Sequence, residues 1–227
     1  KFVRARFHRL NNMPEFAAMT ADMDDSIGRI IDKLSQLDLL NNTWVVFLSD
    51  NGGRNSIPKA AKIKEHRNAP LRNGKHSFYE GGIRVPFIIL GPGVKPGSVN
   101  NVPVCGVDLL PTFADLADYS SPLPDDIDGG SLRPILDSRS TDSVQRPHPF
   151  LVFHQGVDRK PVSAIRVGDY KLVKTWKENR LELFDLSIGI SEADDLSGRM
   201  PDRTQKLDAL LTKYLDEVGG DIPRSGN

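Results

Sequence analysis

Three features that often decide a protein's class are scarce in this sequence of 227 residues. Its single cysteine, Cys105, excludes an internal disulfide bond and leaves the redox compartment open. Its 30 Lys and Arg residues are balanced by 30 Asp and Glu residues, which argues against nucleic-acid binding through bulk charge. No apolar run approaches the roughly 20 residues of a membrane-spanning helix. We therefore expect a globular chain with no nucleic-acid partner and no membrane span.

The sequence also lacks an initiating methionine and a visible signal peptide, because it begins at Lys1. Two explanations fit this observation. A leader was removed, or the chain is a piece of a longer protein.

Residues 44–53, with the sequence WVVFLSDNGG, contain the most informative local pattern. The apolar run predicts a short strand buried on both faces, as in parallel sheets. Asp50 and Asn51 then stand at the carboxyl end of that strand, where open α/β sheets bind ligands. Their oxygen atoms suit a hard divalent cation, and the two glycines allow close backbone approach. The same residues are also typical of a plain turn, so both interpretations stay open at this point.

The first half of the chain predicts a mixture of helices and strands. Apolar residues recur at helical spacing from residue 12 to residue 37, where Asn12 begins a possible capping box. A second buried strand is predicted at 87–90 and a third near 102–104. A helix then follows Asp108, its predicted N-cap. The polar passage from 54 to 73 is interpreted as a long surface loop.

The second half shows a different pattern after a Pro-, Asp- and Ser-rich connector at 120–148. Four short strands are predicted, at 150–154, 163–167, 170–176 and 181–186. The pair Gly168-Asp169 indicates a two-residue hairpin, and residues 201–218 show one apolar helical face. We therefore predict an α/β protein. Residues 1–135 form part of a mostly parallel sheet with flanking helices, and residues 136–227 form a small α+β subdomain with a four-stranded antiparallel sheet and a helix.

Several short motifs together resemble one enzyme family. They are SDNGG at 49–53, GK at 74–75, YEGGIRVP at 79–86, DLLPT at 108–112 and AIRVGDYKL at 164–172. Their order and rough spacing are similar to those of the type I sulfatases, the arylsulfatase family of the alkaline-phosphatase-like superfamily. The resemblance covers nearly the whole chain. It implies an alkaline-phosphatase-like fold, with residues 1–135 as the C-terminal part of the catalytic domain and 136–227 as the C-terminal subdomain.

The resemblance also assigns site residues. It implies that Asp50 and Asn51 bind an active-site Ca²⁺, with Mg²⁺ as an alternative, and their oxygen donors suit either ion. It implies that Lys75 contacts the sulfate ester as a catalytic and substrate-binding group, whereas Lys75 considered alone would be an exposed loop lysine. His76 is a possible wall of the substrate pocket.

Other residues near these motifs are interpreted as structural. Glu80 and Arg84 are expected to form an ion pair that flanks two glycines. Arg166, Lys171 and Trp176 are interpreted as surface residues, at the edge of the substrate cleft or in surface packing. Cys105 is expected to be a small buried residue before a helix.

The sequence departs from the family at the nucleophile. The resemblance implies a formylglycine made from the Cys or Ser of a C/S-x-P-S-R motif, and this sequence contains no such motif. The paired aspartates that complete the calcium site in the family are absent as well. We therefore expect the formylglycine to lie outside this chain, which would be the C-terminal portion of a sulfatase. The chain alone is then expected to show no sulfatase turnover.

The resemblance implies hydrolysis of sulfate esters by the complete protein, with a sulfated small molecule or glycan as substrate. Aryl, carbohydrate and lipid sulfates all remain candidates. Two alternatives stay open: a phosphodiesterase or phosphonate hydrolase of the same superfamily, and a non-catalytic chain that binds sulfated glycans. The family also implies a periplasmic, secreted or lysosomal-type compartment.

Overall fold

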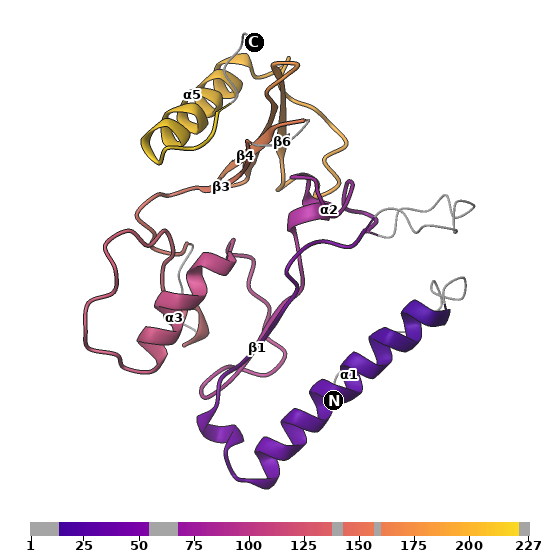
Figure 1. Cartoon of the computed structure of the whole chain (residues 1–227), viewed down its shortest axis with the longest axis vertical. Helices are drawn as coiled ribbons and strands as arrows, with labels where there is room; N and C mark the ends of the chain where they lie inside the picture. The colour runs from indigo at the N-terminus through magenta and orange to yellow at the C-terminus, as the bar shows by residue number, and fades with distance from the viewer. Residues whose placement is uncertain (1–13, 55–67, 138–142, 157–159, 223–227) are drawn as a thin grey trace. The chain divides into compact units, whose positions relative to one another are not determined.

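A computed structural model of the chain describes residues 14–54, 68–137, 143–156 and 160–222 (Figure 1). Its helices are α1 (Pro14–Gln36), α2 (Glu80–Ile83), α3 (Leu109–Leu116), α4 (Arg133–Leu136) and α5 (Pro201–Glu217), with 3-10 turns η1 (Leu40–Asn42) and η2 (Gly106–Asp108). Its strands are β1 (Val45–Leu48), β2 (Phe87–Leu90), β3 (Leu151–Gln155), β4 (Val162–Val167), β5 (Tyr170–Thr175) and β6 (Arg180–Asp185). The mixed α/β class is therefore confirmed.

The chain divides into two compact units. One consists of Lys1–Val46 with Ile89–Val94, and the other of Phe47–Ile88 with Lys95–Asn227. The predicted boundary between residues 135 and 136 stays a prediction. The predicted capping box at Asn12 and most of the loop at 54–73 lie outside the described residues. Of the helices in the described ranges, none has both the length and the apolarity needed to span a membrane.

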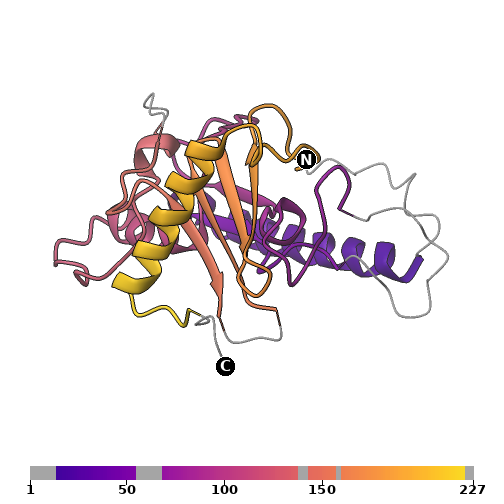
Figure 2. The same cartoon turned by 90° about the horizontal axis from the view of Figure 1, so that it is seen from above.

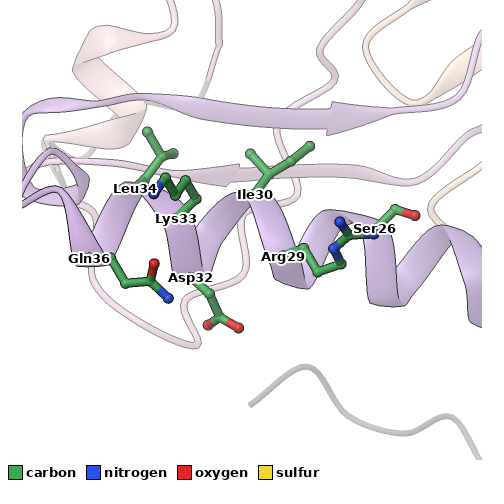
Figure 3. A pocket seen from close by; sticks show the side chains of 7 residues that line it. All are labelled: Ser26, Arg29, Ile30, Asp32, Lys33, Leu34 and Gln36. Carbon is green, nitrogen blue, oxygen red and sulfur yellow. The ribbon is translucent and has the colours of Figure 1, made fainter.

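Helix α1 is the amphipathic helix that the sequence predicts. Ile30 and Leu34 project from one side of it, whereas Asp32 and Gln36 project from the other (Figure 3). A hollow of about 710 Å³ runs along this helix, and all seven residues that line it belong to α1. Such a hollow is a helix face with shallow grooves between its side chains. Among the described residues, no second element adds converging groups to it, so it has no features of a binding site.

Strands β1 and β2 form a two-stranded sheet at the predicted positions. The prediction that they are buried on both faces is wrong, because Leu48, Ile88 and Leu90 are 36%, 46% and 39% exposed. In the described part of the chain, this sheet consists of two strands only. Two strands cannot cover both of their own faces, so apolar side chains remain open to solvent.

The predicted third strand near 102–104 is not formed. Pro103 has no N–H to give to a strand ladder, and its carbonyl accepts a hydrogen bond from Arg146 Nη2 at 2.9 Å. The backbone here is therefore held by a side chain and not by a neighbouring strand. The connector that follows α3 also contains the short helix α4, which the sequence did not reveal.

Asp108 precedes α3 as predicted, but its side chain makes no capping hydrogen bond to that helix. Its buried carboxylate accepts hydrogen bonds from the backbone N–H groups of Cys105 at 2.7 Å and Gly130 at 3.0 Å. It also accepts two from the Arg146 guanidinium, both at 2.7 Å. Four donors satisfy this buried charge, so Asp108 joins three separate stretches of the chain. Cys105 itself is half-buried.

The C-terminal sheet confirms the predicted meander. Its order is β3-β4-β5-β6, with each neighbouring pair antiparallel. Val167 pairs with Tyr170, which leaves Gly168 and Asp169 as the two-residue loop. Gly168 has a φ of 59°, a conformation in which the absence of a Cβ matters. Helix α5 follows and lies across one face of the sheet (Figure 2).

Both faces of this sheet are covered within the same unit. On one face the core consists of Ile165, Leu172 and Leu183 of the sheet and Leu207, Leu211 and Leu215 of α5. On the other face, Ala164, Val173 and Phe184 pack with Leu186 and with Tyr79, which comes from the segment before α2. The strands alternate between the two cores because successive side chains point to opposite faces. The second core fixes the segment that bears the candidate site residues.

Leu211 gives a direct test of the core under α5. It is fully buried, so Leu211→Ala removes apolar contacts and leaves a cavity. We expect the free energy of unfolding to fall by about 2–5 kcal/mol in urea denaturation. Ile188 is 83% exposed and provides the matched control, since Ile188→Ala should change it by less than about 0.5 kcal/mol. Equal effects of the two substitutions would contradict the assigned core.

Candidate functional site

The loop after β1 presents the two predicted metal ligands. The Ser49 hydroxyl donates a hydrogen bond to the carbonyl of Asn51 at 2.8 Å, which closes a turn directly after the strand. The side chain of Asp50 is exposed, and that of Asn51 is half-buried. The turn and the cation-binding interpretations are therefore compatible, because the turn itself places a carboxylate and an amide at the end of β1.

Backbone hydrogen bonds connect this loop to the segment that carries Lys75. The N–H of Gly52 donates to the carbonyl of Gly82 at 2.9 Å, and the N–H of Lys75 donates to the carbonyl of Gly53 at 3.0 Å. The structure thus brings the Asp50-Asn51 loop and Lys75 together, although more than 20 residues separate them in the sequence. The Lys75 side chain is half-buried, not fully exposed as a lone loop lysine would be.

Three glycines allow this close packing. A Cβ on Gly52 would overlap the carbonyl of Gly81, and a Cβ on Gly81 would overlap the carbonyls of residues 72 and 73. A Cβ on Gly82 would overlap the carbonyls of residues 74 and 77. The sequence predicted that Gly52 and Gly53 allow a ligand to approach the backbone closely. In the structure Gly52, Gly81 and Gly82 let backbone pack directly on backbone.

His76 lies beside Lys75 and lines a hollow of about 780 Å³. It is exposed and has a φ of 73°, a left-handed conformation that a non-glycine residue adopts only when its surroundings hold it there. The opposite wall comes from the end of the antiparallel sheet and includes Lys160, Glu178 and Arg180. His76 therefore forms a pocket wall. Lys75 does not line this hollow.

The donor set of the loop fits part of a cation site. A carboxylate and an amide supply oxygen atoms, which Ca²⁺ and Mg²⁺ prefer, but Ca²⁺ takes about 6–8 oxygen ligands. Among the residues that the structure describes, no three His, Cys, Asp or Glu side chains are grouped to hold a metal ion. Asp50 and Asn51 could thus provide two ligands of a larger shell.

Charged groups hold the segment after Lys75 in place, and most of their contacts were not predicted from the sequence. Glu80 Oε2 accepts a hydrogen bond from Arg84 Nη1 at 3.1 Å, which confirms the predicted ion pair. The prediction of Lys171 as a surface residue is wrong, because its side chain is 1% exposed. Its ammonium lies 2.8 Å from a carboxylate oxygen of Glu80 and 2.8 Å from one of Glu192. Lys171 lies on the sheet face that packs against this segment, which explains its burial.

The environments of these carboxyl groups shift their pKa values in opposite directions. Burial disfavours the charged form of Glu80, but Lys171 and Arg84 outweigh it and lower the pKa of Glu80. Burial raises the pKa of Glu192, and its contacts with Lys171 and the Glu80 N–H offset this only in part. Lys171 and Arg84 therefore favour the ionised form of Glu80, whereas burial works against the ionised form of Glu192.

Comparison with known proteins gives a consistent result. A family model described as Sulfatase matches residues 3–119, and one described as N-sulphoglucosamine sulphohydrolase, C-terminal, matches residues 73–219. Arylsulfatase K of Danio rerio is 32% identical over 206 residues, which are 88% of this chain and 36% of that protein. The chain thus spans about a third of the length of this curated relative.

Solved structures agree with the sequence matches. The crystal structure of Ps i-CgsB in complex with k-i-k-neocarrahexaose is 28% identical with a TM-score of 0.71, over 88% of this chain and 42% of that one. The structure of a 2-O GAG sulfatase is 28% identical with a TM-score of 0.60, over 80% of this chain and 38% of that one.

The glycine packing predicts opposite effects of one substitution at two positions. Gly81→Ala would force a methyl group into the carbonyls of residues 72 and 73, so we expect a lower unfolding temperature. Gly28 lies within α1 with nothing near its missing Cβ, so Gly28→Ala should stabilise the helix by about 0.5–1 kcal/mol. Thermal unfolding followed by circular dichroism would show both effects. A neutral Gly81→Ala would contradict the close packing.

Tyr79 predicts a loss of stability at high pH. Burial, followed by its hydrogen bond to Glu182, raises the pKa of Tyr79 from 10.0 to about 12. Between these values the unfolded chain releases a proton that the folded chain keeps, so stability should fall as pH rises from 10 to 12. Unfolding free energies measured across this range should fall less steeply for Tyr79→Phe. Tyr119→Phe, at an exposed tyrosine, should keep the steep slope.

Proposed function

The chain belongs to the sulfatase family, and we propose that the complete protein hydrolyses sulfate esters with the help of a divalent cation, Ca²⁺ or Mg²⁺. One observation carries this proposal. The loop that bears Asp50 and Asn51 is hydrogen-bonded to the segment that bears Lys75, within a chain that matches the sulfatase model. Asp50 and Asn51, which suit a cation, and Lys75, which suits an anion, therefore lie on segments joined by backbone hydrogen bonds.

Each residue has a defined part in this proposal. Asp50 and Asn51 would hold the cation through their side-chain oxygens, and when bound the cation would neutralise charge on the sulfate oxygens. The ammonium of Lys75 would face the sulfate ester and stabilise the charge that develops on the leaving group. Its attraction for a unit negative charge 4 Å away is about 1 kcal/mol in water and about 4 kcal/mol at an effective dielectric constant of 20. We assign the nucleophile to no residue of this chain.

A sulfated glycan or a sulfated small molecule is the substrate class we propose. The relatives' names support it, since one neighbour is a 2-O GAG sulfatase and another was solved with a neocarrahexaose. The hollow beside His76 gives weaker support from this chain, because Lys160 and Arg180 line it together with Glu178, and Arg180 is paired with Glu182 at 3.1 Å. For such substrates we also propose a periplasmic, secreted or lysosomal-type compartment.

The reaction class is tested with the full-length protein and a panel of esters. The panel contains an aryl sulfate, sulfated oligosaccharides, a phosphonate monoester and a phosphodiester. Turnover of sulfate esters above the phosphorus compounds supports the proposal. Preference for a phosphorus ester would favour the alternative hydrolase of the same superfamily, and binding of sulfated oligosaccharides without turnover would favour a non-catalytic protein.

Asp50→Ala tests the cation role within that protein. Removing one carboxylate ligand should lower kcat/KM for the best sulfate ester by at least about 100-fold. It should also remove the rise in unfolding temperature that Ca²⁺ or Mg²⁺ produces, because a ligand stabilises only the state that binds it. Asp125→Ala, at an exposed aspartate outside the loop, serves as the control and should change neither. Retained turnover with a retained cation effect would refute the role of Asp50.

A further inference from the structure

The segment that bears Lys75 is anchored to the antiparallel sheet by a buried triad, which we define as Lys171, Glu80 and Glu192. Lys171 Nζ donates to Glu80 Oε1 and to Glu192 Oε1, both at 2.8 Å. Glu192 Oε2 in turn accepts the backbone N–H of Glu80 at 2.6 Å. The triad side chains are at most 4% exposed. It therefore holds both the side chain and the backbone of Glu80.

A second set of contacts fixes the residue before Glu80. The Tyr79 hydroxyl donates a hydrogen bond to Glu182, whose other oxygen accepts from Arg72 Nη2 at 3.1 Å. The Arg72 guanidinium also lies 3.8 Å from the centre of the Tyr79 ring and donates to the Glu192 carbonyl at 3.2 Å. Arg72 thereby connects this second set of contacts to the triad.

Backbone hydrogen bonds connect these contacts to the candidate site. Arg72 accepts the N–H of Gly81 on its own carbonyl at 2.8 Å, and Gly82 accepts the N–H of Gly52 at 2.9 Å. Gly52 follows Asp50 and Asn51 directly, and Gly53 accepts the N–H of Lys75 at 3.0 Å. A displacement of Glu80 would therefore move the two glycines that hold the loop. Small displacements of this kind cost catalysis heavily, since about 1 Å can reduce a rate by about 100-fold.

We propose that Lys171 and Glu192 are positioning residues, which hold the Glu80 backbone so that Lys75 and the Asp50-Asn51 loop keep their mutual placement. The proposal rests on the function proposed above for that loop. Neither residue needs to touch the substrate, because both act through Glu80. The sheet of the C-terminal part thus sets the geometry of a site that lies outside it.

The triad predicts distinct effects of substitutions at Lys171 and at Glu192. Lys171→Met leaves two buried carboxylates facing each other without a cation, which is strongly unfavourable. Glu192→Gln keeps one oxygen that can accept the Glu80 N–H, but its amide nitrogen then faces the Lys171 ammonium, whereas Glu192→Ala removes both acceptors. A role in positioning therefore predicts a smaller effect of Gln than of Ala.

Lys174 provides a matched control on the same strand. Its ammonium is bonded to Asp208 of α5 at 2.7 Å, and it lies on the opposite face of the sheet from Lys171. Lys174→Met therefore also breaks a largely buried ion pair, but one that does not reach Glu80. Loss of stability alone should affect both lysine variants, and loss of positioning should affect only Lys171→Met.

The experiment uses the full-length protein and the four variants Lys171→Met, Glu192→Ala, Glu192→Gln and Lys174→Met. Hydrogen exchange by mass spectrometry is measured on peptides covering residues 49–53 and 74–83, at a temperature where every variant is folded. We expect exchange at least tenfold faster in Lys171→Met and Glu192→Ala, a smaller increase in Glu192→Gln, and less than a twofold change in Lys174→Met. The value of kcat/KM for the best sulfate ester should fall at least tenfold in the first two variants only.

The two readouts separate this proposal from the proposed function. Equal exchange in Lys171→Met and Lys174→Met, or in Glu192→Ala and Glu192→Gln, would overturn the positioning role. If Lys171→Met does not fold, the two Glu192 variants decide the question. If exchange changes as expected but the wild-type protein turns over no sulfate ester, the proposed function fails and the positioning role stands.

Discussion

The structure around the candidate site depends on one buried cation, the ammonium of Lys171 between Glu80 and Glu192. Removing one member of a buried ion pair commonly costs about 3–5 kcal/mol, because its partner is left charged and without compensation. The antiparallel sheet and the segment before α2 therefore become stable together. An apolar trio could also join them, but it would not fix the direction of a backbone N–H as the Glu192 carboxylate does.

Most of the C-terminal fold could be predicted because its signals are local. Alternating apolar residues give the strands, Gly168 gives the hairpin, and one apolar face gives α5. The wrong predictions concern segments whose structure is determined by contacts with residues far away in the sequence. The carbonyl of Pro103 is bound by Arg146, 43 residues further on, so no strand forms there. The burial of β1 and β2 was overestimated, because an apolar run does not show whether other elements of the chain pack against both faces of the strand.

The candidate site shows the same division between local and distant information. Ordered motifs pointed to Asp50, Asn51, Lys75 and His76, whose roles stay predictions, and the structure places all four on adjoining segments. The triad could not be found this way, because Lys171 is 91 residues from Glu80 and Glu192 is 112 residues from it. A weak signal existed for Lys171 alone. In the predicted strand it shares a face with Val173, at an interval of two residues, and a buried face makes a lysine there unusual.

The hollow beside His76 has walls of different origin, and this has a consequence for how the family can diversify. One wall belongs to the segment whose glycines allow no added side chain, so its sequence has little room to change. The other wall includes Glu178 and Arg180, at the turn between β5 and β6, where side chains are exposed. In the function proposed above, recognition and chemistry would therefore be encoded in separate stretches of sequence. Exchanging that hairpin end would change one wall of the hollow and leave the loop with Asp50 and Asn51 unchanged.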